Sequence, residues 1–146
     1  MKIILFLFIL CFLACGTDQG EIKTYTYIVR NESGVPIKVL AYNSLSITPN
    51  EIVYSTTLEN GNEIKKTFQD GLPSRGYFFR DFFGYLNGRG NVTDSIRIIY
   101  NNLKYKSFNS KDCTGGNRNP LNECLYRNTE ETFILTPEDY ANAIQK

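Results

Sequence analysis

Short segments in which apolar and polar residues alternate run through most of this chain, and they limit its fold more than any other feature. In residues 24–30, for example, Tyr25, Tyr27 and Val29 fall on one side. Alternation of this kind is typical of strands with one buried face, and turn residues separate the segments. The pattern predicts strands at residues 24–30, 37–43, 51–58, 63–69, 95–100, 103–108 and 131–135.

No helical pattern separates these segments, so the sequence does not offer the crossover helices that a parallel sheet requires. We therefore expect an all-β fold, an antiparallel β-sandwich of the Ig-like or jelly-roll-like kind. Asn60-Gly61 predicts a hairpin between residues 51–58 and 63–69, because a type I′ turn needs positive φ at both central positions. A second hairpin is expected between residues 95–100 and 103–108.

The end of the chain has the pattern of a short helix, which we expect over residues 137–145. Thr136 is a suitable N-cap, and Pro137 suits the first helical position. Asp139 stands three residues after Thr136, as the acidic member of a capping box does. The sequence thus predicts a sandwich with a short C-terminal helix.

The first residues have the features of a secretory signal. Lys2 precedes an apolar run at residues 3–13, and the small residue Ala14 precedes Cys15. The run is shorter than the ~20 apolar residues that a membrane span needs. A cysteine directly after the small residue resembles a bacterial lipoprotein signal, in which it becomes the first mature residue and carries lipid such as palmitate. The alternative is an ordinary signal peptide, cut nearby, in which Cys15 is incidental.

The lipoprotein interpretation divides the chain into three parts. They are a signal peptide at residues 1–14, a lipid anchor and tether at 15–21, and a single β-sandwich domain at 22–146. The last part has a length typical of one domain, for which the usual size is about 100 to 200 residues.

The composition argues against several kinds of site. The chain has no histidine, which is the usual general base and the commonest imidazole ligand of metals. Its formal net charge is +1 and no basic block stands out, so we do not expect nucleic acid as a partner. We predict no metal and no cofactor. Carboxylate enzymes stay open, but no catalytic pair stands out among Glu51, Asp70, Asp81, Asp94 and Glu123, which are scattered among turns.

Two cysteines are left once the signal and the anchor are set aside. Cys11 lies in the signal and Cys15 takes lipid, so Cys113 and Cys124 are expected to form a disulfide in an oxidising compartment. The alternative, a pair of metal thiolates, needs further cysteine or histidine ligands that the chain lacks. The same loop carries oxygen ligands suited to calcium, but without EF-hand spacing: Asp112, Asn117, Asn119 and Glu123. A solvated loop is the interpretation that we favour.

Residues 77–86 form the densest aromatic stretch. Whether the stretch is a helix or a strand, burial in the core is the default interpretation. The functional alternative is an exposed patch that binds a partner or a glycan. Its members would be Phe78, Phe79, Phe82 and Phe83.

Several segments together resemble the small uncharacterised lipoproteins of Bacteroidota. They are Cys15 with its signal, residues 27–31 running into Ser33-Gly34, and residues 94–101, 118–121 and 136–143. The resemblance implies an envelope location and brings no activity or catalytic residue. Asp94-Ser95-Ile96 also resembles the short sequence on which bacteria of this phylum O-glycosylate exported proteins, which makes Ser95 a candidate acceptor. The alternative for Ser95 is a strand start that faces solvent.

These observations favour a lipid-anchored protein of the bacterial cell envelope, with the outer membrane as its expected location. Its domain would face the periplasm or the cell surface. We expect a binding or assembly module that contacts the membrane through its lipid and an envelope protein or glycan through its domain. The competing function is a carboxylate-based hydrolase that acts on envelope polymers or glycans.

Overall fold

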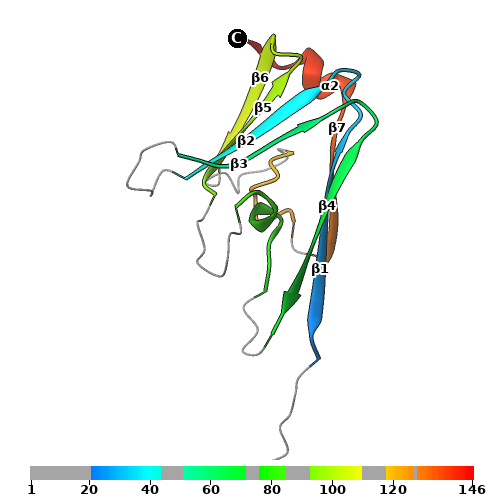
Figure 1. The fold of residues 1–146 in the computed structure, drawn as a ribbon, viewed down its shortest axis with the longest axis vertical. Coiled ribbons are helices and arrows are strands. Elements are labelled where there is room, and N and C mark those ends of the chain that lie inside the picture. Colours follow the sequence, from blue (N-terminus) through cyan, green and yellow to red (C-terminus); the bar gives the residue numbers. More distant parts are fainter. Residues whose placement is uncertain (1–20, 44–50, 72–75, 85–92, 110–117, 127) are drawn as a thin grey trace, which may run out of the picture.

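The protein folds into two β-sheets that face one another, as a computed structural model shows (Figure 1). The structure describes residues 21–43, 51–71, 76–84, 93–109, 118–126 and 128–146. The elements are β1 (Lys23–Asn31), β2 (Ile37–Asn43), β3 (Glu51–Leu58), β4 (Glu63–Asp70), the 3₁₀ helix η1 (Phe79–Phe83), β5 (Ser95–Tyr100), β6 (Lys104–Asn109), β7 (Glu130–Leu135), α2 (Pro137–Ala141) and β8 (Ile144–Gln145). The all-β sandwich with a short helix near the C-terminus is therefore confirmed.

One sheet has three strands in the order β4-β1-β7, and the other has five in the order β3-β2-β5-β6-β8. All pairings are antiparallel except that of β1 with β7, in which Tyr27 lies opposite Glu131 in a parallel register. The expectation of a purely antiparallel fold is wrong at this pair. Between β1 and β7 the chain passes through β2, β3, β5 and β6 of the other sheet, so the parallel pair needs no crossover helix of its own.

The hairpin expected at Asn60-Gly61 is also wrong, although the chain does turn there, because β3 pairs with β2 and β4 pairs with β1. The turn is not of type I′ either, since Gly61 has a positive φ of +84° but Asn60 does not. The turn packs on the end of β1 instead: the Gly61 amide donates to the Asn31 carbonyl at 2.7 Å, and the Asn31 amide donates to the Asn62 carbonyl at 2.9 Å. This turn thus carries the chain from one sheet to the other.

The second hairpin is confirmed, because β5 and β6 pair antiparallel from Ser95 and Asn109 to Tyr100 and Lys104. Asn101 and Asn102 lie between the strands with φ of +47° and +57°. Asparagine tolerates this left-handed region better than most residues, and a type I′ turn requires it at both positions.

The C-terminal helix is shorter than expected. α2 begins at the predicted cap, where the Thr136 hydroxyl accepts from the Asp139 amide and the Asp139 carboxylate accepts from the Thr136 amide at 2.9 Å. It ends at Ala141, and Ile144 instead pairs with Tyr105 as part of β8. Pairing with the free edge of β6 satisfies backbone groups that about one further helical turn would otherwise satisfy.

The core lies between the sheets and is rich in aromatic rings. η1 enters it from below, and the Phe79 ring centre lies 5.3 Å from that of Tyr27. Phe79, Phe82 and Phe83 are each 1% exposed, so they follow the core interpretation and do not form the exposed patch. Phe78 is half-buried. Burial of these large rings removes their apolar surface from water and so stabilises the fold. Exposed rings would leave that surface in contact with water whenever no partner is bound.

Candidate functional site

The outward surface of the five-stranded sheet is the most distinctive surface that the described residues form. Along β2 and β5 every second side chain is buried toward the core, as with Val39, Ala41, Ile96 and Ile98 at 0–1% exposure. The intervening residues face away from it, since side chains alternate along a strand. We call this surface the outer face. Its members on the three central strands are Lys38, Leu40, Tyr42, Ser95, Arg97, Ile99, Tyr105, Ser107 and Asn109.

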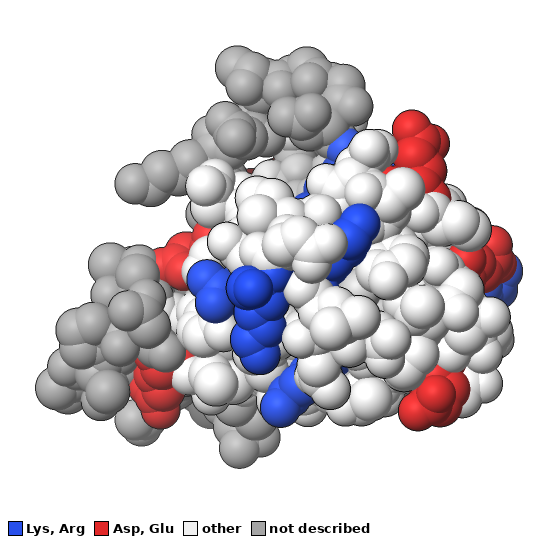
Figure 2. Space-filling view, turned by 90° about the horizontal axis from the view of Figure 1, so that it is seen from above, with Lys and Arg blue, Asp and Glu red and all other residues white. Residues whose placement is uncertain are grey.

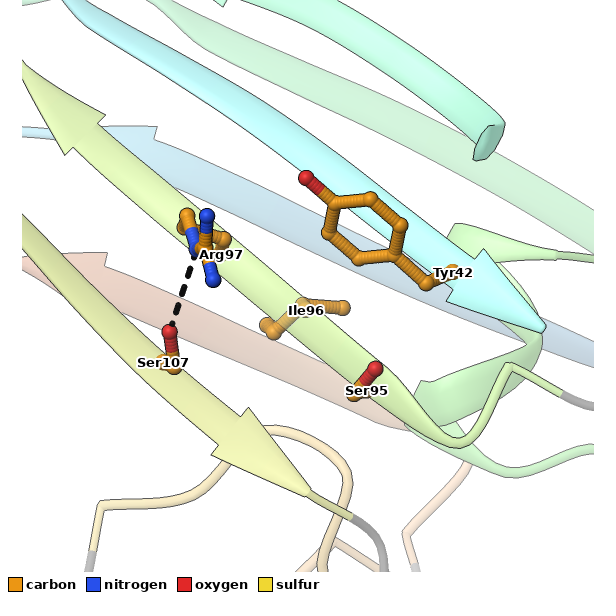
Figure 3. Close-up of a pocket in the computed structure, with 5 residues that line it drawn as sticks. All are labelled: Tyr42, Ser95, Ile96, Arg97 and Ser107. Atoms are coloured by element: carbon orange, nitrogen blue, oxygen red, sulfur yellow. Dashed lines mark hydrogen bonds between the residues drawn. The ribbon is translucent and has the colours of Figure 1, made fainter. Parts of the chain in front are cut away.

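A shallow open pocket of about 420 Å³ lies in this face (Figure 3). Its lining residues are Tyr42, Ser95, Ile96, Arg97 and Ser107. The strand register brings them together, because Tyr42 pairs with Ser95 and Ser107 pairs with Arg97. The Tyr42 ring and the Arg97 side chain stand over the same side of the sheet, with the serine hydroxyls beside them.

Arg97 is held in place by two neighbours on β6. Its Nε lies 3.4 Å from the Ser107 hydroxyl, to which it donates a long hydrogen bond. Its guanidinium carbon lies 5.0 Å from the centre of the Tyr105 ring, a distance at which a cation is attracted by an aromatic face. Neither neighbour is charged, so the positive charge of Arg97 is oriented without being neutralised.

The outer face carries positive charge without a matching negative one. On its three central strands Lys38 and Arg97 are cations, and the described residues supply no carboxylate to either. A second pocket of about 270 Å³ adjoins Lys38. That pocket is lined by Pro36, Ile37, Lys38, Thr57, Ile99, Asn101 and Asn102. Both pockets therefore offer cations and hydroxyls and, among their described lining residues, no carboxylate.

Other cations of the described chain are used in holding the fold together. Lys106 and Arg118 contact the Asp139 carboxylate at 3.2 and 2.9 Å, and Asp139 is only 5% exposed. Burial alone would raise the pKa of Asp139, but the Thr136 amide, Arg118 and Lys106 outweigh it and hold the pKa below its ordinary value. Figure 2 looks onto the end of the sandwich where α2 lies and shows Lys and Arg side chains gathered near the middle of that end.

Lys66 is a further cation whose contacts stabilise the fold. Its Nζ lies 4.0 Å from the Tyr54 ring centre and 4.8 Å from that of Phe82, and it donates to the Phe82 carbonyl at 2.5 Å. Burial lowers the pKa of Lys66. The ammonium thus joins β4 to β3 and η1 inside the molecule and does not face a ligand.

The carboxylates singled out in the sequence mostly support turns. Asp70 accepts a hydrogen bond from the Gly76 amide at 2.7 Å, and Asp81 accepts one from the Phe78 amide at 2.7 Å. Glu123 forms an ion pair with Arg80. Burial raises the pKa of Asp81, and the charge of Glu123 raises it further. Glu123 pairs with Arg80, the residue next to Asp81, and sequence reasoning did not single out these two acids together because they are far apart in the chain.

Some of the predicted modification sites lie among the described residues, and others lie outside them. Cys15 and Cys113 lie outside the described residues. Cys124 lies in a described turn, where its amide donates to the Asn122 side chain at 2.8 Å. The disulfide therefore stays a prediction, which the masses of the intact chain before and after reduction would test. Ser95 is the first residue of β5 and is half-buried, and a glycan on it would stand at the mouth of the pocket.

The loop residues considered for calcium do not assemble into a site in the described part. Asp112 and Asn117 lie outside it, Glu123 contacts Arg80, and the side-chain oxygen Oδ1 of Asn119 accepts from the Leu121 amide at 3.0 Å. The described residues contain no group of three histidine, cysteine or acidic side chains placed to hold a metal. Within the same residues, no helix has the length and apolar character needed to cross a membrane.

The sequence reasoning missed the outer face as a site. Alternation already places Tyr42 and Arg97 on the opposite side from the buried residues of their strands. It does not tell which strands are neighbours, and the pocket exists only because β5 lies between β2 and β6. Comparisons of this chain with protein-family models, curated proteins and solved structures found no match, so the site rests on its own geometry.

Proposed function

We propose that this chain is a lipid-anchored protein of the bacterial envelope whose outer face binds another envelope component. The observation that carries the proposal is the open pocket beside Arg97, whose positive charge has no carboxylate partner among the described residues. A partner with a negative group can form an ion pair with such an oriented surface charge, and no ion pair within the protein has to break first.

Support for the anchor comes from the N-terminal sequence. Lys2, the apolar run at residues 3–13 and Cys15 after Ala14 have the order of a lipoprotein signal. Lipid at Cys15 followed by a short polar tether would keep the domain at a membrane surface, that of the outer membrane. A single acyl chain binds only marginally, whereas two or more give stable anchoring.

Replacement of Cys15 tests the anchor. A chain with Cys15→Ala is expected to leave the membrane fraction, whereas Cys11→Ala, which alters the signal but not the acceptor, is expected to stay in it. Intact mass should show the added acyl groups in the wild-type chain and in Cys11→Ala alone. Equal membrane association of both variants would contradict the lipid anchor.

The outer face is tested by the size of the complex that the full chain forms when extracted from membranes in mild detergent. We expect Arg97→Gln and Tyr42→Ala to elute at a smaller size than the wild-type chain. Arg30→Gln is the matched control, because Arg30 lies on the other sheet and its charge is paired with Glu63 at 2.7 Å. An unchanged elution of the outer-face variants would contradict a binding role for this surface.

The second candidate function is a carboxylate-based hydrolase, favoured by the placement of Glu123 against Arg80, the residue next to Asp81. A raised pKa is what a general acid needs, and the pKa of Asp81 is raised. Two features count against it: Arg80 pairs with Glu123, and neither pocket of the outer face contains a described carboxylate. Loss of envelope-polymer cleavage in Asp81→Asn, with folding retained, would favour the hydrolase.

A further inference from the structure

We propose that the pocket between Tyr42 and Arg97 binds an acidic saccharide, a sugar that carries a carboxylate. This inference rests on the proposed function of the outer face and specifies its ligand. It follows from the charge of the pocket, from the hydrogen bonding of the backbone beneath it and from the side chains that surround it.

The charge of the pocket calls for one negative group. Among the described lining residues Arg97 is the single cation, and its guanidinium is oriented by Tyr105 and Ser107. A guanidinium presents parallel N–H donors that match the two oxygens of a carboxylate, and such bidentate pairs are stronger than hydrogen bonds between neutral groups. A ligand carboxylate would therefore supply the ion pair that the described residues do not.

The backbone beneath the pocket disfavours a phosphate dianion. Sites for phosphate usually combine cations with several free backbone N–H groups, as at a helix N-terminus or in a glycine-rich loop. Here β5 pairs with β2 on one side and with β6 on the other along its whole length, so its amides are used in the sheet. The pocket thus offers one cation and side-chain hydroxyls, which fit a carboxylate with a single charge.

The same pairing disfavours an extended peptide as the ligand. Peptides that bind to sheets usually add a strand at an open edge, where free main-chain groups provide most of the affinity. β5 is the central strand of the five, and the pocket lies over it and its two neighbours. A ligand here contacts side chains only, so it must supply its own polar groups.

The side chains around Arg97 suit a sugar ring. The hydroxyl groups of Tyr42, Ser95 and Ser107 can each donate and accept, which matches the hydroxyls of a saccharide. The Tyr42 ring adds apolar surface to the same pocket. Its volume of about 420 Å³ lies in the usual range for small-molecule sites, about 300 to 1,000 Å³.

The test is a calorimetric titration of the full chain in detergent micelles, with intact mass used to select protein that is unmodified at Ser95. The ligands are an oligogalacturonate, a neutral galactose oligomer of equal length, inorganic phosphate and a glutamate-rich peptide. We expect the oligogalacturonate to bind at least tenfold more tightly than each of the other three. Equal binding of the neutral sugar, or tighter binding of phosphate or the peptide, would overturn the inference.

The variants locate the contact. Arg97→Gln should weaken oligogalacturonate binding at least tenfold, Arg97→Lys should restore part of it, and Arg30→Gln should leave it unchanged. Tyr42→Phe removes one hydroxyl and should weaken binding by a smaller factor, which provides a second readout if Arg97→Gln unfolds on thermal melting. Unchanged binding in Arg97→Gln, or in Tyr42→Phe where that variant provides the readout, would place the ligand elsewhere.

The outcome also separates this inference from the proposed function. If the envelope complex of the full chain depends on Arg97 but oligogalacturonate neither binds nor competes, the outer face is a binding surface for another ligand and the saccharide is wrong. If the complex does not depend on Arg97 at all, the proposed function itself fails.

Discussion

The ammonium of Lys66 lies 4.0 Å from the centre of the Tyr54 ring, and this contact joins two strands that belong to different sheets. Lys66 comes from β4 and Tyr54 from β3, with the Phe82 ring 4.8 Å from the same nitrogen. The aliphatic part of a lysine side chain can cover apolar surface while its ammonium is attracted by aromatic faces. Lys66 thus contributes to the contact between the two sheets at a position where an apolar residue would also fit.

Lys66 gives a first prediction, on the pH dependence of stability. Burial lowers the pKa of Lys66 in the folded state below its ordinary value of 10.5, so the unfolded chain holds this proton more tightly. Its contribution to stability is therefore gained as pH rises through the folded pKa toward 10.5, and is absent below that window. Relative to Lys66→Met, the wild-type chain should gain free energy of unfolding as pH rises from the lowered folded pKa of Lys66 to about 10.5, as urea denaturation would measure. A constant difference would contradict this.

Asp139 gives a second prediction. It caps α2 and contacts both Lys106 and Arg118, so Asp139→Asn should lower the free energy of unfolding by about 2 to 3 kcal/mol. Because its folded pKa lies below 3.8, the stabilisation is present at neutral pH and is lost as pH falls from about 4 through the folded pKa. Glu138→Gln, an exposed acid in the first turn of the same helix, is the control and should change little.

Two buried tyrosines give a third prediction, in which removal of the hydroxyl group affects stability differently at the two positions. The Tyr27 hydroxyl donates to the Tyr77 carbonyl at 2.6 Å, whereas the Tyr100 hydroxyl finds no hydrogen-bond partner among the described residues. Tyr27→Phe should therefore cost about 1 kcal/mol, and Tyr100→Phe should be neutral or stabilising, since it removes a buried group that lost its water. Thermal melting of both variants measures the difference. A larger loss in Tyr100→Phe than in Tyr27→Phe would show that the hydroxyl assignment is wrong.

The turn that carries the chain between the sheets gives a fourth prediction. Gly61 has a φ of +84° with open space around its Cβ position, so Gly61→Ala should cost about 1 to 2 kcal/mol through the backbone alone. Gly71 also has open space but lacks a positive φ, so Gly71→Ala should change stability by less than about 0.5 kcal/mol. Equal effects in urea denaturation would contradict a conformational requirement at Gly61.

The strands and their turns could be predicted from the sequence because both depend on local physics. Alternation in residues such as Tyr25, Tyr27 and Val29 located β1, and the cap at Thr136 marked the start of α2. Pairing depends on distant residues instead. Asn60-Gly61 has the chemistry of a hairpin, yet β3 finds a partner in β2 and β4 finds one in β1, so the same turn becomes a link between sheets.

The candidate site could not be predicted for the same reason. Tyr42 and Arg97 are more than fifty positions apart in the sequence, and nothing local indicates that β2 and β5 are neighbours. The densest aromatic stretch attracted attention as a patch, but its rings Phe79, Phe82 and Phe83 are needed to fill the space between the sheets. The candidate site instead consists of a few exposed residues that neighbouring strands of one sheet bring together.

The claim that the outer face binds an envelope partner is tested most directly by cross-linking in intact cells. A photoreactive residue is placed at Asn109, an exposed outer-face residue that pairs with Ser95 of the pocket, and at Thr67, which is exposed on β4 of the other sheet. We expect illumination to shift the mass of the chain labelled at position 109, and the shift to be lost when Arg97→Gln is added, while the chain labelled at position 67 stays unchanged. An adduct at position 67 alone, or no adduct at position 109, would contradict the account.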